Sequence, residues 1–185
     1  MSGKKNVIVL GFDGLDPYYL NKFLNKLPHL RKVIQEGCFG ILKSTIPPVT
    51  PGAWVGITSG TNPGKSGILG FFKFDRTAYR FKLISARDKQ VKDVWDIISN
   101  NGYTCGLVNV PVTYPPKRIK HFMISGRFTP GRVAAFPKSL ERSLKSAGYI
   151  SFIDITNLAF ICANKRLIRI NIEKEITNEI CVASL

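Results

Sequence analysis

The strongest constraint on the fold is a short apolar run near the start of the chain, residues 6–11, which leads to a lone carboxylate at Asp13. A continuous run rich in β-branched residues is typical of a parallel strand that is buried on both faces. Asp16-Pro17 then predicts the start of a helix, because Asp caps helices and Pro favours the first helical position. A strand, a loop with a carboxylate and a helix in this order indicate an α/β fold.

The other elements are predicted from apolar periodicity and from turn residues. Thr50-Pro51 is a second cap–proline pair, and it predicts a helix that runs to about Ser59 and ends at Gly60. The remaining predictions are a helix from residue 17 that breaks at Pro28 and ends near Gly37, a strand over residues 39–46, strands within 71–84, a helix over 91–98, a strand over 104–110 and a helix over 140–147.

The chain has 185 residues, of which 44% are hydrophobic and 21% are charged, so it is long enough for one domain with a substantial core. No apolar run approaches the roughly 20 residues that a membrane-spanning helix needs. The run at the N-terminus is also too short for the core of a signal peptide. We therefore expect a cytoplasmic protein without a membrane partner.

The formal net charge is +15, and residues 1–150 carry all of the excess. Residues 151–185 hold four Lys or Arg and four Asp or Glu, which leaves 23 basic and eight acidic residues in the first part. Such a balance suits an anionic ligand, a nucleic acid or an anionic membrane surface, and it does not discriminate between them. The basic residues form no run longer than two, and no nucleic-acid recognition motif is present, so nucleic acid is not the expected partner.

Asp13 and Thr50 are the candidate chemical groups, and each has an ordinary alternative. Asp13 follows a predicted strand at the sheet edge where α/β proteins bind ligands, which favours metal ligation, but it also suits a turn or a helix cap. Thr50 at a helix N-terminus lies where phosphate binds well, and a metal ion would make its hydroxyl a nucleophile. A plain helix cap is its alternative, and the two residues alone leave both interpretations open.

Two other kinds of site are excluded. The loop from Asn62 to Gly67 contains a Gly-Lys-Ser sequence, but it lacks the spacing of a nucleotide-binding P-loop and follows a predicted helix. The four cysteines form no Cys-x-x-Cys pair, and the two histidines, His29 and His121, are isolated. A structural zinc site of familiar spacing is therefore excluded, and reduced thiols are expected.

Three blocks of sequence occur in order along the first part of the chain. They are Val-Ile-Val-Leu-Gly-Phe-Asp13-Gly-Leu-Asp, Thr45-Ile-Pro-Pro-Val-Thr50-Pro-Gly-Ala-Trp54 and Thr58-Ser-Gly-Thr-Asn-Pro-Gly-Lys-Ser-Gly67-Ile. Together they resemble the type I phosphodiesterase / nucleotide pyrophosphatase family of the alkaline phosphatase superfamily, in its prokaryotic cytoplasmic branch. With two later stretches, 124–130 and 136–149, the resemblance covers roughly residues 5–150.

The resemblance implies an α/β/α sandwich around a mainly parallel sheet, with two divalent metal ions, usually zinc, at the strand ends. It implies that Asp13 ligates one ion. It also implies that Thr50 is the nucleophile, is bound to the other ion and forms a covalent phospho-intermediate in an in-line displacement. The expected partner is a phosphate-ester small molecule or a nucleotide.

The sequence departs from the family pattern in three ways. Ser66 stands where the family usually has a histidine, and Gly52 stands where it usually has a proline. The further metal ligands of the family, in an Asp-x-x-x-His and an Asp-His-Gly element, are absent. Two zinc ions need about six or seven protein ligands, and Asp13 and Thr50 are the two that we can name.

We therefore expect a partial, truncated sandwich. Residues 1–155 would be the N-terminal part of an alkaline-phosphatase-like catalytic domain, and residues 156–185 a tail that does not align with the family, as a frameshift would produce. A sheet that stops partway predicts an open strand edge and an uncovered apolar face.

Three functions remain open. The first is a metal-dependent phosphoesterase of the phosphodiesterase or nucleotide pyrophosphatase type, a fragment with little or no activity alone that a complementing C-terminal chain would complete. The second is a catalytically dead remnant. The third is a basic α/β module that binds nucleotide or nucleic acid without chemistry. The small number of metal ligands predicts low activity for the chain by itself.

Overall fold

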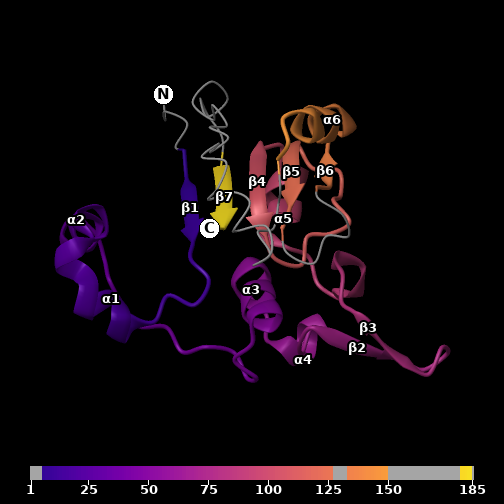
Figure 1. Cartoon of the computed structure of the whole chain (residues 1–185), viewed down its shortest axis with the longest axis horizontal. Helices are drawn as coiled ribbons and strands as arrows, with labels where there is room; N and C mark the ends of the chain where they lie inside the picture. The colour runs from indigo at the N-terminus through magenta and orange to yellow at the C-terminus, as the bar shows by residue number, and fades with distance from the viewer. Residues whose placement is uncertain (1–5, 127–132, 150–179, 185) are drawn as a thin grey trace.

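The computed structural model describes residues 6–126, 133–149 and 180–184, and its centre is a five-stranded sheet (Figure 1). The strands, in sheet order, are β1 (Ile8–Gly11), β7 (Ile180–Ser184), β4 (Cys105–Val110), β5 (His121–Ser125) and β6 (Ala135–Phe136). The first four run parallel to their neighbours, whereas β6 is antiparallel to β5. The predicted α/β class is confirmed, and the sheet is mixed.

The other elements include short helices and a separate hairpin. They are α1 (Pro17–Phe23), the 3-10 helix η1 (Leu24–Lys26), α2 (Pro28–Glu36), α3 (Thr50–Ser59), α4 (Pro63–Ser66), the hairpin strands β2 (Phe72–Asp75) and β3 (Arg80–Leu83), the 3-10 helix η2 (Ala86–Asp88), α5 (Val94–Asn100) and α6 (Lys138–Ser146). The helix start at Pro17 is confirmed, since the Asp16 carboxylate accepts a hydrogen bond from the Tyr18 N–H at 2.7 Å. Within the described ranges, no helix is long and apolar enough to cross a membrane.

The main core lies where α3 and α5 pack against strands β4 and β5. Its buried side chains are Trp54, Trp95, Cys105, Leu107, Val110, Ile119 and Met123. On α3, Val55 belongs to a second cluster with Ile68, so this helix buries side chains in two directions. The sequence of α3 is apolar on all sides, which is the pattern of a helix that is enclosed rather than amphipathic.

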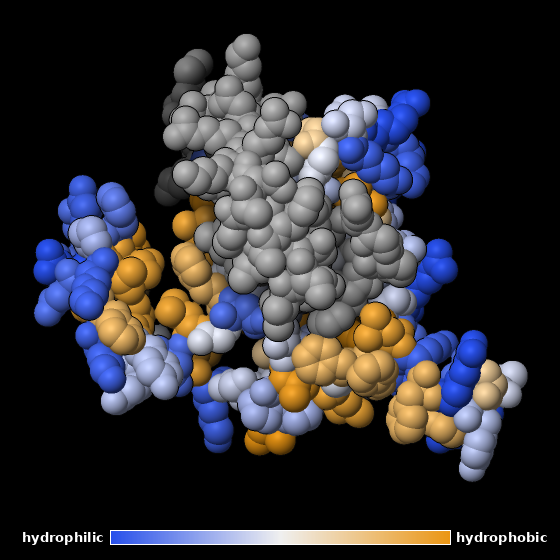
Figure 2. Space-filling view, viewed as in Figure 1, coloured by the Kyte–Doolittle hydropathy of each residue, from blue (hydrophilic) through white to orange (hydrophobic). Residues whose placement is uncertain are grey.

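β1 is a strand, as predicted, but its predicted burial on both faces is wrong. Ile8 and Leu10 are 58% and 59% exposed. β1 is the end strand of the sheet, so no described strand pairs with its outer edge. Helices α1 and α2 stand apart from the sheet, and Figure 2 shows apolar side chains on their flank that is turned toward it. The apolar run therefore lacks the covering layers for which its sequence is suited.

The predicted strand over residues 39–46 is also wrong, because this segment has no regular secondary structure. Ile41 and Leu42 are 74% and 88% exposed, and Ile46 is 80% exposed. A strand needs a neighbour for its N–H and C=O groups, and none of the described strands pairs with this segment. Apolar β-branched composition alone therefore did not suffice to form the element.

A buried ion cluster holds the C-terminal half of α3 to the start of α5. The Asp93 carboxylate, just before α5, is fully buried and accepts hydrogen bonds from Thr58 Oγ1 at 3.0 Å and from Lys89 Nζ. Burial lowers the pKa of the Lys89 ammonium group, and the Asp93 charge opposes this shift. Lys117 Nζ lies 3.4 Å from the same carboxylate. Because the Lys89 and Asp93 side chains are both removed from water, each charge is stabilised mainly by the opposite charge of the other.

Replacing the buried carboxylate tests this cluster. We expect Asp93→Asn to lower the free energy of unfolding by about 3 kcal/mol, because Lys89 would remain buried without the carboxylate that it contacts directly. Urea denaturation followed by circular dichroism measures the change. The control is Glu36→Gln, which removes an exposed pair with Lys32 and should cost less than about 0.5 kcal/mol. Equal losses in the two variants would contradict the proposed role of the cluster.

Candidate functional site

Asp13 and Thr50 are distant in sequence and lie together in the structure. Asp13 lies in the turn after β1, and Thr50 is the first residue of α3. The Thr50 hydroxyl Oγ1 donates to Asp13 Oδ1 at 3.4 Å. This distance is long for an O–H···O bond, so the hydrogen bond is weak. It nevertheless brings one carboxylate and one hydroxyl to a common point at the carboxyl end of β1.

The helix start differs by one residue from the prediction. Val49 is the capping residue, with extended backbone angles, and Thr50 already belongs to the helix with Pro51 after it. The interpretation of Thr50 as a plain N-cap is therefore wrong, and its hydroxyl points to Asp13 instead. At the other end the predicted stop is confirmed, since Gly60 has a φ of 66° in the left-handed region that favours glycine.

Trp54 is a third member of the site that the sequence interpretation did not identify. Its indole Nε1 donates to Asp13 Oδ1 at 3.3 Å, so the oxygen that contacts Thr50 also accepts from Trp54. The two donors are four residues apart on α3, a spacing that places side chains on one face of a helix. That spacing was the available signal, because Trp54 stands in the same sequence block as Thr50.

The donor set fits part of a metal site. Carboxylate and hydroxyl oxygens are suitable ligands for divalent ions. In the part of the chain that the structure describes, no group of three or more His, Cys, Asp or Glu side chains gathers closely enough to hold an ion. Asp13 and Thr50 therefore form only part of a set of metal ligands, and either metal position needs further donor atoms.

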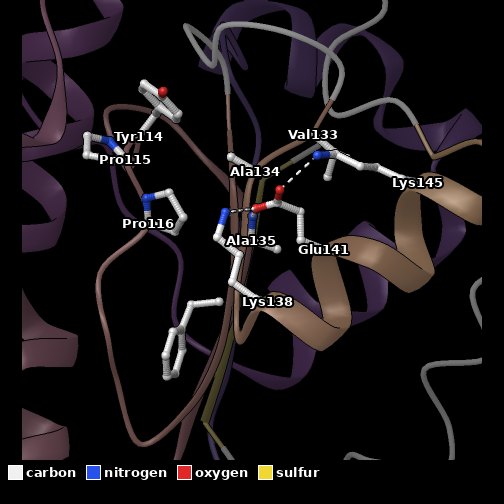
Figure 3. Close-up of a pocket in the computed structure, with 10 residues that line it drawn as sticks. Tyr114, Pro115, Pro116, Val133, Ala134, Ala135, Lys138, Glu141 and Lys145 are labelled. Atoms are coloured by element: carbon white, nitrogen blue, oxygen red, sulfur yellow. Dashed lines mark hydrogen bonds and ion pairs between the residues drawn. The ribbon is translucent and has the colours of Figure 1, made fainter.

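A separate cavity of about 410 Å³ lies beside α6 and β6 (Figure 3). Tyr114, Pro115 and Phe136 contribute to its walls, and Asp13, Thr50 and Trp54 do not. Glu141 projects toward it, where its carboxylate accepts from the Ala135 N–H at 3.2 Å and pairs with Lys138 and Lys145, each at 2.8 Å. The Glu141 carboxylate, the two lysines and the Ala135 N–H thus bond one another, as expected of a cluster with a structural role.

The model of the type I phosphodiesterase / nucleotide pyrophosphatase family matches residues 7–159, which is most of the chain. The chain belongs to this family. The resemblance noted from the three sequence blocks is thereby confirmed, and the match includes both Asp13 and Thr50.

Solved structures show the same fold. Two crystal structures of phosphonoacetate hydrolase from Sinorhizobium meliloti 1021, in complex with phosphonoformate and with phosphonoacetate, each superpose with a TM-score of 0.62, at 16% and 15% sequence identity. In both cases the alignment covers 98% of this chain and 46% of the other. The chain thus spans about half the length of these neighbours. No curated protein matched the chain in sequence.

Two departures from the family pattern have local structural reasons. A Cβ at Gly52 would lie 3.1 Å from the Ile68 carbonyl oxygen, so this glycine lets the segment after α4 pack closely on α3. Ser66 is fully buried, and its hydroxyl donates to the Pro63 carbonyl and accepts from the Ile68 N–H, each at 3.3 Å. The side chain at the usual histidine position of this phosphodiesterase family therefore bonds α4 and the residue two positions after it.

The Glu141 cluster gives a prediction for the dependence of stability on pH. Hydrogen bonds from Lys138 and then Lys145 lower the pKa of Glu141 from 4.5 to about 2. A lowered pKa in the folded state stabilises the protein above the unfolded value, and this stabilisation is lost as the pH falls from about 4.5 to 2. We expect Glu141→Gln to cost about 1 kcal/mol at pH 7, a value reduced because both lysines are exposed.

The difference in free energy of unfolding between wild type and Glu141→Gln should be smaller at pH 3 than at pH 7. At pH 3 the wild-type carboxylate begins to be protonated, so its ion pairs stabilise the folded state less. Denaturant unfolding at the two pH values measures the difference. Glu36→Gln serves as the exposed control, with little difference at either pH. A wild-type advantage over Glu141→Gln that stays constant from pH 7 to pH 2 would show that the carboxylate charge is not involved.

Proposed function

We propose that this chain carries the nucleophile-bearing part of a metal-dependent phosphoester hydrolase, with Thr50 as the nucleophile and Asp13 as a metal ligand. The observation that carries the proposal is the contact of 3.4 Å between Thr50 Oγ1 and Asp13 Oδ1 at the N-terminus of α3. Family membership supports a phosphoester substrate. The phosphonates bound by the structural neighbour support a small anionic ligand of similar chemistry.

The chain's own groups would bind and attack the phosphoryl group. At the start of α3, Pro51 has no N–H, so Thr50 and Gly52 carry the backbone N–H groups without a partner four residues earlier in the helix. These groups and the helix dipole favour the phosphate oxygens. The first turn of α3 contains no acidic residue to oppose this. Thr50 Oγ1 would lose its proton to solvent and form a bond to phosphorus as the bond to the leaving oxygen breaks, and solvent would protonate the departing oxygen. Water would then attack the phosphothreonine, release the phosphate product and return a proton to Thr50 Oγ1.

The expected cofactors are two divalent ions, with zinc as the usual choice for this family. When bound, they would supply the positive charge that stabilises an alkoxide at Thr50 and the charge that develops on the leaving oxygen. Asp13 would hold one ion and Thr50 would contact the other. Since these two residues leave most ligand positions unfilled, we expect little or no turnover from the chain alone.

Thr50 can be tested with a chromogenic phosphodiester, bis(p-nitrophenyl) phosphate, in the presence of Zn²⁺. We expect turnover far below the roughly 10 s⁻¹ of a typical enzyme. Any zinc-dependent turnover should fall at least about 100-fold in Thr50→Ala, which has no attacking oxygen, and less in Thr50→Ser. Mass spectrometry of the peptide that contains residue 50 should detect a phosphoryl adduct in wild type and not in Thr50→Ala.

Two results would contradict this proposal in different ways. Zinc-dependent turnover that survives Thr50→Ala would exclude Thr50 as the nucleophile. Rapid zinc-dependent turnover that Thr50→Ala abolishes would confirm the nucleophile and contradict the expected low activity. The alternative of a basic module that binds nucleic acid, which the net charge of +15 favours, predicts instead an affinity that falls steeply with salt and no dependence on Thr50.

We further propose that residues 1–155 form the N-terminal part of the catalytic domain and that the remaining ligands lie on polypeptide outside these 185 residues, for example on a complementing chain. The open edge of β1 and its exposed apolar side chains support this, because they offer a place for further strands and a covering layer. The cytoplasmic location stays a prediction from the sequence.

The nucleotide sequence that follows the codon of Leu185 tests the proposal without protein chemistry. We expect an open frame that encodes an Asp-x-x-x-His and an Asp-His-Gly element. If that frame is present, co-expression of its product should raise the zinc-dependent diesterase activity and reduce aggregation of this chain. A downstream sequence with neither element, together with a monodisperse and cooperatively melting chain, would contradict the proposal.

A further inference from the structure

Trp54 is placed between the nucleophile helix and the strand that leads to Asp13. It lies one turn after Thr50 on α3, and its side chain is 6% exposed within the main core. Its single polar atom, Nε1, reaches out of that core to Asp13 Oδ1 at 3.3 Å. A buried indole N–H usually needs a hydrogen-bond partner, and here the partner is the candidate metal ligand.

The indole also lies against the backbone of β1. A Cβ built on Gly11, the last residue of β1, would lie 2.2 Å from Trp54 Cη2 and 2.7 Å from Cζ3. Such distances are far inside van der Waals contact, so the ring occupies the space that a side chain at this position would need. Trp54 therefore meets the strand-and-turn segment at two points, its backbone at Gly11 and its carboxylate at Asp13.

The other tryptophan provides a contrast. Trp95 is fully buried in the same core, and its Nε1 has no hydrogen-bond partner among the described residues. Trp95 lies instead against the buried ion cluster, since Lys89 Nζ is 5.1 Å from the centroid of its ring. The indole of Trp54 does more than fill space, because its N–H points at a charged oxygen that also contacts Thr50.

We propose that Trp54 is a positioning residue that sets the orientation of the Asp13 carboxylate relative to Thr50. Since both donors project from the same face of α3, they orient Asp13 Oδ1 toward the helix that carries the nucleophile. The inference rests on the proposed function only in treating Asp13 as a metal ligand. Groups that orient a ligand typically change metal affinity 10- to 100-fold when they are removed.

The first experiment tests the contact itself, independently of metal or activity. In an ¹H–¹⁵N spectrum of the full chain the two indole signals are assigned with Trp54→Phe. In Asp13→Ala, the Trp54 indole proton should shift and exchange faster with solvent, because its acceptor is lost. Thr50→Val should leave this signal in place. An indole signal with unchanged shift and exchange rate in Asp13→Ala would overturn the proposal.

The second experiment measures zinc affinity by isothermal titration calorimetry, with Zn²⁺ alone as the probe. Trp54→Phe keeps an aromatic ring and removes the N–H, and it should weaken the Asp13-dependent binding at least about tenfold. The matched control is Trp95→Phe, which removes an N–H without a partner and should leave this affinity unchanged. Gly11→Ala should weaken binding as Trp54→Phe does, because the added methyl group displaces the indole.

Each variant is compared only if its circular dichroism spectrum matches wild type. Unchanged zinc affinity in both Trp54→Phe and Gly11→Ala would overturn the proposal. Failure of the proposed function looks different: zinc binding would then be the same in Asp13→Ala as in wild type. In that case the indole signal in Asp13→Ala alone decides whether Trp54 orients the carboxylate.

Discussion

The packing of α3 between the sheet and the segment after α4 is the constraint on which the rest of the structure depends. Near its C-terminal end, Thr58 bonds the buried Asp93 carboxylate, whose charge is balanced by Lys89. Toward its N-terminal end, Trp54 joins the main core and contacts Asp13. Because Thr50 begins this helix, the same contacts that stabilise the core also determine where the candidate nucleophile lies.

Local signals in the sequence predicted the helix ends that are determined by a few neighbouring residues. Asp16-Pro17 and Gly60 marked helix ends correctly because caps and left-handed glycines act within a few residues. The strand predicted at 39–46 is absent, and the strands β5, β6 and β7 were not predicted. A strand forms only beside a partner, and periodicity does not identify that partner. The exposure of β1 has the same cause. Its sequence suits burial, but burial also requires other elements that cover the strand, and the strand's own sequence does not show whether they are present.

The candidate site was predictable only in part, and for a different reason. Asp13 and Thr50 are each ambiguous alone, since caps and turns use the same residue types. The resemblance of whole blocks singled them out, and the structure places their oxygens in contact. Trp54 was not identified because an aromatic residue within a helix is usually a core residue. Its four-residue spacing from Thr50 puts both on one helix face, but the approach of Asp13 to that face is a long-range contact that spacing does not predict.

The close approach of Trp54 to Gly11 has a consequence for how the sequence can vary. The two positions share one volume, so a larger residue at position 11 requires a smaller one at position 54. A tryptophan there is therefore compatible only with a glycine at the end of β1. In relatives that keep the same helix and strand, these two positions should change together or not at all, although they lie in separate blocks of the sequence.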